Sequence, residues 1–208
     1  MDIIYIIFAY FIGSIPTAYI CFKIKNKQDI RNYGSGNSGA LNIFRSYSFK
    51  AATIVLLLDL IKSGCIAIIG KNINISDTTF YLATIMAVIG HNFPVYLKFK
   101  GGKGVAVASG ITLIAIPIPA ISAGITIATL TLILKSPLWG IFIGALVLNV
   151  LNIIINQSFI MFLWCGSISL IILFTHLSRR RKELIPAIKE INLKKIGEIE
   201  EPIFLINN

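Results

Sequence analysis

Long apolar stretches separated by short polar loops run through most of the chain. A helix needs about 20 residues to cross the ~30 Å hydrocarbon core of a bilayer, and two stretches have this length. One is shorter, which predicts a tilted span or a locally thinned bilayer. Two are so long that we expect each to turn and cross twice. The predicted spans, about seven in all, are residues 3–22, 51–70, 77–90, two within 104–134 divided near Pro117 and Pro119, and two within 137–175 divided at Asn152, Asn156 and Gln157.

Composition agrees with this pattern. The chain has 208 residues, of which 56% are hydrophobic and 13% charged, and its mean hydropathy is +0.82. These values are typical of a polytopic membrane protein rather than a soluble domain. The net charge of +10 could indicate nucleic acid, but the basic residues lie in short runs at the ends of apolar stretches, as in cytoplasmic loops. We therefore expect no nucleic-acid partner.

The placement of charge sets the predicted orientation. Asp2 is the only charged residue before Lys23, so the first stretch lacks the basic start of a secretory signal and is interpreted as an uncleaved span. With seven spans and the N-terminus outside, only Lys71 among the 19 Lys and Arg residues falls in an external loop, and Lys62 lies inside the second span. Treating residues 104–134 as one span would place Lys135 and the basic run from Arg179 outside, against the positive-inside tendency.

We therefore predict an all-α, polytopic integral membrane protein with the N-terminus outside and the C-terminus in the cytoplasm. A single membrane domain is expected over residues 1–178, and residues 179–208 are expected to form a charged cytoplasmic tail. Cys21, Cys65 and Cys165 lie singly within apolar stretches, so no disulfide framework or metal spacing is present. The sequence gives no sign of a metal or an organic cofactor.

A first polar loop, DIRNYGSGNSGALNIFR at residues 29–45, is called loop A here. Its GSGNSG segment matches G-x-G-x-x-G, but no hydrophobic strand precedes it, so a dinucleotide fold is not indicated. A glycine-rich turn that leads into a helix still suits phosphate. Ser35 and Asn37 can donate hydrogen bonds, and Arg45 can bind phosphate through two bonds. The alternative interpretation is a flexible loop between helices.

A second polar loop, GHNFPVYLKFKGGKGVA at residues 90–106, is called loop B. Gly101, Gly102 and Gly104 surround Lys103 and predict an anion-binding nest of backbone N–H groups, with the N-terminus of a helix following. We expect Gly102 to need a positive φ or a close approach to phosphate. The spacing is not that of a Walker A loop. His91 could act as a proton shuttle or phosphate donor, or it could be an interfacial histidine bonded to backbone.

Other charged residues have simpler interpretations. Lys98 and Lys100 are expected to attract anionic membrane lipids. Asp59 and Lys62 are three positions apart and share one face of the second span, and we interpret them as a structural ion pair.

Four motifs carry a resemblance to a known family. They are GSIP at 13–16, loop A, the Asp59 and Lys62 pair, and loop B. In order and spacing they resemble the bacterial acyl-phosphate:glycerol-3-phosphate acyltransferases of the PlsY type. The resemblance implies seven spans, cytoplasmic loops in the bacterial inner membrane, and acyl transfer from acyl phosphate to the 1-hydroxyl of glycerol 3-phosphate. This would be the first acylation step of phospholipid synthesis, giving lysophosphatidic acid and phosphate.

The resemblance also implies a set of site residues and partners. Acyl phosphate and glycerol 3-phosphate are the implied substrates, with membrane lipids and an acyl-phosphate-supplying enzyme as further partners. The chain departs from the family pattern at Leu41, where Thr is usual, and after His176, where LSRRRKELI lacks the family's Asn. The expected catalytic residues are Ser35, Arg45, Lys103 and His91, and the expected substrate-binding residues are Gly34, Gly36, Asn37, Asn42, Gly101, Gly102, Gly104 and His176.

The chemistry needs no covalent intermediate, because an acyl phosphate is already activated. The site must hold two anions together and stabilise the charge that develops during transfer. We expect phosphate to help accept the hydroxyl proton, with Ser35 or His91 assisting. The alternative function is a small transporter or channel for phosphorylated solutes, which would place more polar residues at mid-membrane. A structural membrane protein would not require the two glycine-rich loops.

Overall fold

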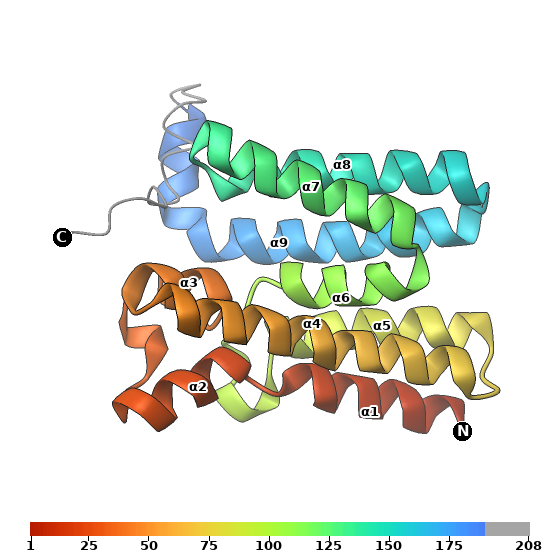
Figure 1. Cartoon of the computed structure of the whole chain (residues 1–208), viewed down its shortest axis with the longest axis horizontal. Helices are drawn as coiled ribbons and strands as arrows, with labels where there is room; N and C mark the ends of the chain where they lie inside the picture. Colours follow the sequence, from red (N-terminus) through yellow and green to blue (C-terminus); the bar gives the residue numbers. More distant parts are fainter. Residues whose placement is uncertain (190–208) are drawn as a thin grey trace. The chain divides into compact units, whose positions relative to one another are not determined.

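The computed structural model describes the backbone of residues 1–189 and the side chains of residues 1–179. Within the described residues the chain is all-helical, with nine α-helices and two short 3-10 helices (Figure 1). This confirms the predicted fold class. Contacts divide the chain into two units, Met1–Ala115 and Ile116–Asn208. A single membrane domain over residues 1–178 stays a prediction, and most of the predicted tail at 179–208 lies outside the described residues.

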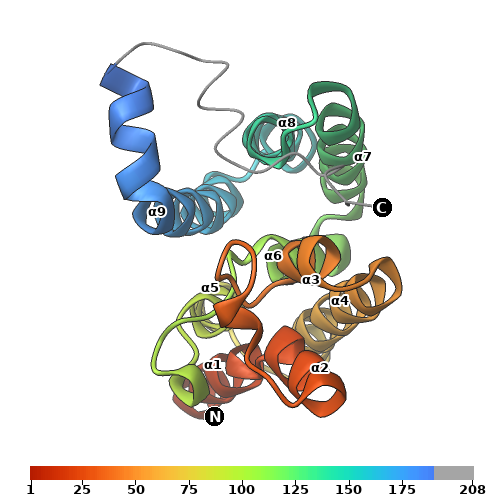
Figure 2. The same cartoon turned by 90° about the vertical axis from the view of Figure 1, so that its left-hand side faces the viewer.

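The first unit is built around four apolar helices that run side by side (Figures 1 and 2). α1 packs along α5, and α4 packs along α6. At the end of the unit opposite the N-terminus, η1 and α3 of loop A lie next to α2 (Figure 1), and η2 of loop B packs on α1. The elements are α1 (Asp2–Ser14), α2 (Thr17–Asn26), η1 (Ile30–Asn32), α3 (Ala40–Ser46), α4 (Phe49–Asn72), α5 (Asp77–Asn92), η2 (Val95–Leu97) and α6 (Val105–Ala115).

Glycines allow these helices to approach closely. A methyl group on Gly13 would lie 2.2 Å from the carbonyl oxygen of Ala87, and one on Gly90 would lie 2.3 Å from that of Tyr10. The α1–α5 contact therefore depends on small residues, as is usual where membrane helices pack. Between α4 and α6, a methyl group on Gly110 would lie 2.2 Å from Oγ of Ser63.

The second unit contains three helices, α7 (Pro117–Leu134), α8 (Pro137–Asn156) and α9 (Phe159–Lys189). α8 packs on both α7 and α9. In the apolar interface between α8 and α9, Nδ2 of Asn149 donates to Oγ of Ser169 over 3.0 Å. Hydrogen bonds of this kind hold membrane helices together where the hydrophobic effect does not.

The predicted spans can be compared with the helices. Six segments of the described chain are long and apolar enough to cross a membrane, while α6 is an apolar helix of 11 residues, roughly 16 Å long at ~1.5 Å per residue. The breaks expected within 104–134 and 137–175 are confirmed, at Ile116 and at Gln157–Ser158. The first candidate span runs over Asp2–Asn26, and the break within it at Ile15 and Pro16, which divides α1 from α2, was not predicted. Seven crossings and their orientation stay predictions.

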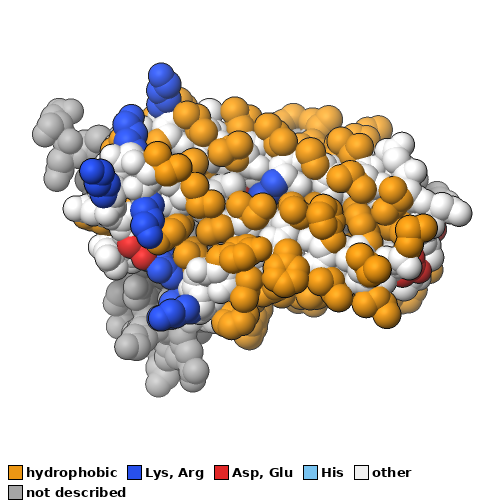
Figure 3. All heavy atoms as spheres, turned by 90° about the horizontal axis from the view of Figure 1, so that it is seen from below, with side chains coloured by type: hydrophobic (Ala, Val, Ile, Leu, Met, Phe, Trp, Pro, Cys, Tyr) orange, Lys and Arg blue, Asp and Glu red, His pale blue; other side chains and the backbone are white. Residues whose placement is uncertain are grey.

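Basic side chains gather toward one end of the face drawn in Figure 3, and hydrophobic side chains cover most of the remainder. Many large apolar side chains of the helices are exposed, including Leu57, Ile61, Ile121 and Leu170. An apolar exterior of this extent fits lipid rather than water.

Candidate active site

Loop A is folded around the amide of Asn42, whose side chain is 1% exposed. Its Oδ1 accepts from the backbone N–H of Ser35 over 2.9 Å and from Oγ of Ser35 over 3.2 Å. Its Nδ2 donates to the carbonyl oxygens of Ile30, Tyr33 and Asn37 over 3.2, 3.0 and 2.8 Å. Asn42 therefore shapes the loop from within, and its predicted contact with substrate stays a prediction.

Two glycines of loop A have backbone angles that favour glycine. Gly34 has φ +52° and Gly36 has φ +68°, in the left-handed region that side chains disfavour. A methyl group on Gly34 would also lie 2.5 Å from Oδ1 of Asn42. The predicted tight turn is confirmed, and α3 begins soon after it at Ala40.

Ser35 lies in the glycine turn of loop A, and Arg45 lies at the end of loop A in α3. Ser35 is half-buried at the turn, where its hydroxyl reaches Asn42. Arg45 is half-buried in the last turn of α3, seven residues long. Asn37, also predicted to bind substrate, is half-buried, and its carbonyl oxygen accepts from Nδ2 of Asn42.

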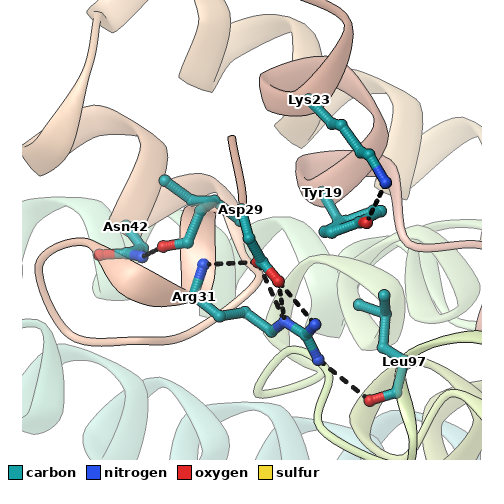
Figure 4. Close-up of polar contacts among 7 residues, drawn as sticks. Tyr19, Lys23, Asp29, Arg31, Asn42 and Leu97 are labelled. Atoms are coloured by element: carbon teal, nitrogen blue, oxygen red, sulfur yellow. Dashed lines mark hydrogen bonds and ion pairs between the residues drawn. The ribbon is translucent and has the colours of Figure 1, made fainter. Parts of the chain in front are cut away.

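Arg31 joins loop A to loop B, a link that the sequence did not reveal (Figure 4). Its guanidinium forms an ion pair with Asp29 at 2.6 Å and donates to the carbonyl oxygen of Leu97 over 3.1 Å. The guanidinium also lies 5.6 Å from the ring centre of Tyr19. The hydrogen bond from Arg31 holds the pKa of Asp29 below its usual range, and the same bond raises the pKa of Arg31. Both loops therefore meet at one end of the first unit.

Loop B differs from the predicted nest. The N–H of Gly101 donates to the carbonyl oxygen of Asn92 over 3.2 Å, and that of Gly102 donates to His91 over 2.9 Å. These two N–H groups close the C-terminus of α5, so the expectation that they point to an anion is wrong. Lys103 is half-buried two residues before Val105, where α6 begins. The following helix N-terminus, expected from the sequence, is confirmed.

The glycines of loop B make room for α5. A methyl group on Gly101 would lie 2.2 Å from the carbonyl oxygen of His91, and one on Gly102 would lie 1.9 Å from Nε2 of the same residue. Of the glycines in this loop, only Gly104 has a positive φ, +86°. The expectation for Gly102 is therefore corrected: the residue in close approach is His91.

A buried polar cluster lies against the same loop. Nζ of Lys62 lies 2.7 Å from Oδ1 of Asp59, and Oγ1 of Thr17 donates to that oxygen, also over 2.7 Å. Nδ1 of His91 lies 3.4 Å from Nζ of Lys62. The predicted ion pair is confirmed, but the sequence missed its connection to His91. The sequence feature that could have indicated this connection is the position of His91 at the end of the next apolar stretch. A role of His91 in proton transfer stays a prediction.

His176 belongs to the second unit, in α9, where its side chain is 4% exposed. The other predicted site residues all belong to the first unit. The predicted binding of substrate by His176 stays a prediction.

Geometry and surface together define an α-helical integral membrane protein in which two glycine-rich, basic loops meet at one end of the first unit. Residues 3–184 match the family described as Glycerol-3-phosphate acyltransferase. The chain belongs to this family of membrane acyltransferases, and the predicted family and enzyme class are confirmed.

Curated relatives and solved structures agree with this family assignment. A glycerol-3-phosphate acyltransferase of Thermoanaerobacter pseudethanolicus is 39% identical over 181 residues, covering 86% of this chain and 89% of its own. One from Ehrlichia ruminantium is 50% identical over 105 residues, covering 50% and 53%. The crystal structure of PlsY (YgiH), an integral membrane glycerol 3-phosphate acyltransferase, in its glycerol 3-phosphate form has 27% identity and a TM-score of 0.80, covering 92% and 98%. Its lysophosphatidic acid form gives a TM-score of 0.76 at 26% identity, covering 91% and 92%.

Proposed function

We propose that this chain transfers a fatty acyl group from acyl phosphate to the 1-hydroxyl of glycerol 3-phosphate. The hydroxyl oxygen attacks the acyl carbon, and the bond from that carbon to the phosphate oxygen breaks. The products are lysophosphatidic acid and inorganic phosphate, and the hydroxyl proton passes to phosphate. The observation that carries this proposal is that two glycine-rich loops, each with a basic side chain, meet at one end of a chain of this family.

The basic residues bind the phosphate groups in this proposal. Arg45 offers a planar guanidinium that can make two parallel bonds to phosphate. Lys103 adds a full charge next to the N-terminus of α6, whose dipole also favours an anion. Neutralising both phosphates lowers their mutual repulsion and stabilises the charge that develops on the leaving group. Ser35 assists at the reacting hydroxyl.

The remaining predicted residues shape the loops or extend the site. Gly34, Gly36, Asn37 and Asn42 hold loop A in its turn, and Gly101, Gly102 and Gly104 allow loop B to pack on α5. We also propose that His176, in the second unit, binds substrate. The active site lies on the cytoplasmic side of the bacterial inner membrane, where soluble glycerol 3-phosphate reaches it and a separate enzyme supplies acyl phosphate.

Purified protein in detergent, given acyl phosphate and glycerol 3-phosphate, tests the function directly. We expect phosphate release that requires glycerol 3-phosphate and equals the lysophosphatidic acid formed, mole for mole. A reaction without glycerol 3-phosphate measures hydrolysis, and one with acyl-CoA in place of acyl phosphate tests the donor. Phosphate release that does not depend on glycerol 3-phosphate would contradict the proposal.

A further inference from the structure

Lys62 has three acceptors around one ammonium group, all within the first unit. Nζ lies 2.7 Å from Oδ1 of Asp59, 2.7 Å from the carbonyl oxygen of Ile15 and 3.4 Å from Nδ1 of His91. An ammonium has three N–H donors and no acceptor, so each acceptor can receive one hydrogen. The side chains of Lys62 and Asp59 are 10% and 1% exposed, and a buried pair of this kind needs its remaining hydrogen-bonding capacity satisfied.

Nδ1 of His91 lies 3.4 Å from Nζ of Lys62 and 3.7 Å from Oδ1 of Asp59. With the Lys62 ammonium as the donor to Nδ1, that nitrogen carries no proton and the ring proton of His91 is on Nε2. Nε2 faces loop B, because a methyl group on Gly102 would lie 1.9 Å from it. The carbonyl oxygen of His91 also accepts from the N–H of Gly102 over 2.9 Å. His91 therefore touches Gly102 with both its ring and its backbone.

The other end of the cluster holds the break between α1 and α2. Ile15 and Pro16 separate the two helices, and the carbonyl oxygen of Ile15 accepts from Lys62. Thr17, the first residue of α2, donates to Asp59 over 2.7 Å. Two hydrogen bonds thus fix the break to α4. The cluster connects three helices to the glycine-rich segment that carries Lys103.

We propose that Lys62, Asp59 and His91 are positioning residues, which hold the backbone of Gly101 and Gly102, and with it Lys103, in place for acyl transfer. In this role His91 does not take the substrate proton, since its acceptor nitrogen is occupied by Lys62. The absence of a side chain at Gly102 is required by the imidazole rather than by phosphate. This inference rests on the proposed function only where activity is the measurement.

A double substitution separates the two explanations of Gly102. Gly102→Ala places a methyl group against the imidazole and should lower kcat/KM by roughly 100-fold, the size of effect expected when a reacting group is displaced by about 1 Å. His91→Asn removes Nε2 but keeps an acceptor near the position of Nδ1. The double variant should then recover about tenfold or more over Gly102→Ala, since residues in contact couple in this range. A double variant no more active than Gly102→Ala would overturn the steric part of the proposal.

Lys62→Met tests the ammonium, and Lys71→Met is its matched control. Both lysines are in α4, and Nζ of Lys71 also donates to backbone, over 2.7 Å to the carbonyl oxygen of Ile114 at the end of α6. Lys62→Met should lower kcat/KM by roughly 10- to 100-fold, and Lys71→Met should leave it within about twofold. Equal losses in the two variants would show a general effect of lysine in α4 and overturn the assignment.

The effect of the ion pair on the stability of the protein can be measured separately from its effect on the position of loop B, through the melting temperature and the activity. Lys62→Met leaves Asp59 buried without its charged partner, so it should lower the melting temperature. The double variant Asp59→Asn, Lys62→Met removes both charges and should recover the melting temperature but not the activity, because the links to Ile15 and His91 stay broken. If activity returns together with the melting temperature, the pair is structural and the proposal fails.

The tautomer can be measured without any turnover. The chain has two histidines, so ¹⁵N-histidine labelling gives two imidazole signals, and His176→Gln assigns them. We expect the pattern of a neutral ring protonated at Nε2 for His91, with Nδ1 shifted in Lys62→Met. A ring protonated at Nδ1, or at both nitrogens at neutral pH, would overturn the inference. Because this readout needs no substrate, an inactive wild type would contradict the proposed function and leave the tautomer test standing.

Discussion

Asn42→Ala should disorder loop A and so weaken the binding of glycerol 3-phosphate that we propose for this site. The substitution deletes an amide that is 1% exposed. It removes the acceptor of the Ser35 N–H at 2.9 Å and a donor that reaches three backbone carbonyls between 2.8 and 3.2 Å. The NH₂ group has two hydrogens, so two carbonyls at most are fully bonded at once.

The magnitude follows from this count. Two donated bonds and one accepted backbone bond, at ~1 kcal/mol each, give about 3 kcal/mol of local stabilisation. Water that enters the opened loop would reduce this value, because it can bond to the backbone N–H and carbonyl groups that lose the Asn42 amide as their partner. A loss of about 2–3 kcal/mol corresponds to a roughly 30- to 150-fold increase in the population of the open loop.

Hydrogen exchange followed by mass spectrometry measures this opening in peptides that cover residues 30–39. Exchange there should rise in Asn42→Ala while exchange in α4 is unchanged, and KM for glycerol 3-phosphate should rise with it. Asn42→Asp is the matched variant: it keeps the acceptor for Ser35 but places a carboxylate oxygen against the carbonyls, so it should be no better than Ala. A higher KM with wild-type exchange would show that Asn42 binds substrate directly and would refute a role in shaping the loop.

Three further outcomes are expected. Arg45→Ala should lower kcat/KM by roughly 10- to 100-fold, since a charge-assisted bond is worth ~1.5–3 kcal/mol, and wild-type turnover in the inserted protein would refute its assignment. Lys103→Ala should abolish acyl transfer, and Lys103→Arg should rescue poorly because a planar guanidinium does not replace a compact ammonium; Lys98→Ala is the control, and a greater loss there would contradict the phosphate site. Arg31 holds the pKa of Asp29 in the folded protein below its value in the unfolded chain, which is near ~4. The ion pair therefore stabilises the fold fully above that unfolded pKa, and this stabilisation is lost as the pH falls through the folded pKa. Both side chains are 26% exposed, so the contribution of the pair to the free energy of unfolding should stay below ~1 kcal/mol. Between pH 5 and 2 the melting temperature of Asp29→Asn should fall less steeply than that of the wild type, and equal slopes would contradict this.

The fold was largely predictable because the bilayer restricts the possibilities. A chain this apolar has few ways to satisfy its backbone other than helices, and the breaks near Pro117 and Gln157 could be located from proline and polar residues. The break at Ile15 and Pro16 was missed because residues 3–22 have the length of one span. Its exposed carbonyl is satisfied by Lys62, which a local pattern does not show.

The candidate site was predictable in its residue types but not in its contacts. Glycine and basic residues indicated turns and phosphate, and the positive φ angles at Gly34, Gly36 and Gly104 agree. The N–H groups of Gly101 and Gly102 were misassigned because their acceptors lie at the end of α5. Spacing along the chain shows which groups can donate, and tertiary packing determines where they do so.

The ion pair within α4 also bears on how the protein enters the membrane. An isolated Asp or Lys at the centre of a helix adds ~2.5–3.5 kcal/mol to the free energy of insertion. Since Asp59 and Lys62 are three positions apart, α4 carries its own counter-ion and can leave the translocon with no net charge at its centre. Ile15 and Thr17 have already been synthesised by then, whereas His91 follows Lys62 by 29 residues. We expect α4 to integrate stably with α1 and α2 before α5 arrives, so that the imidazole is the last component added to a polar cluster already assembled in the bilayer.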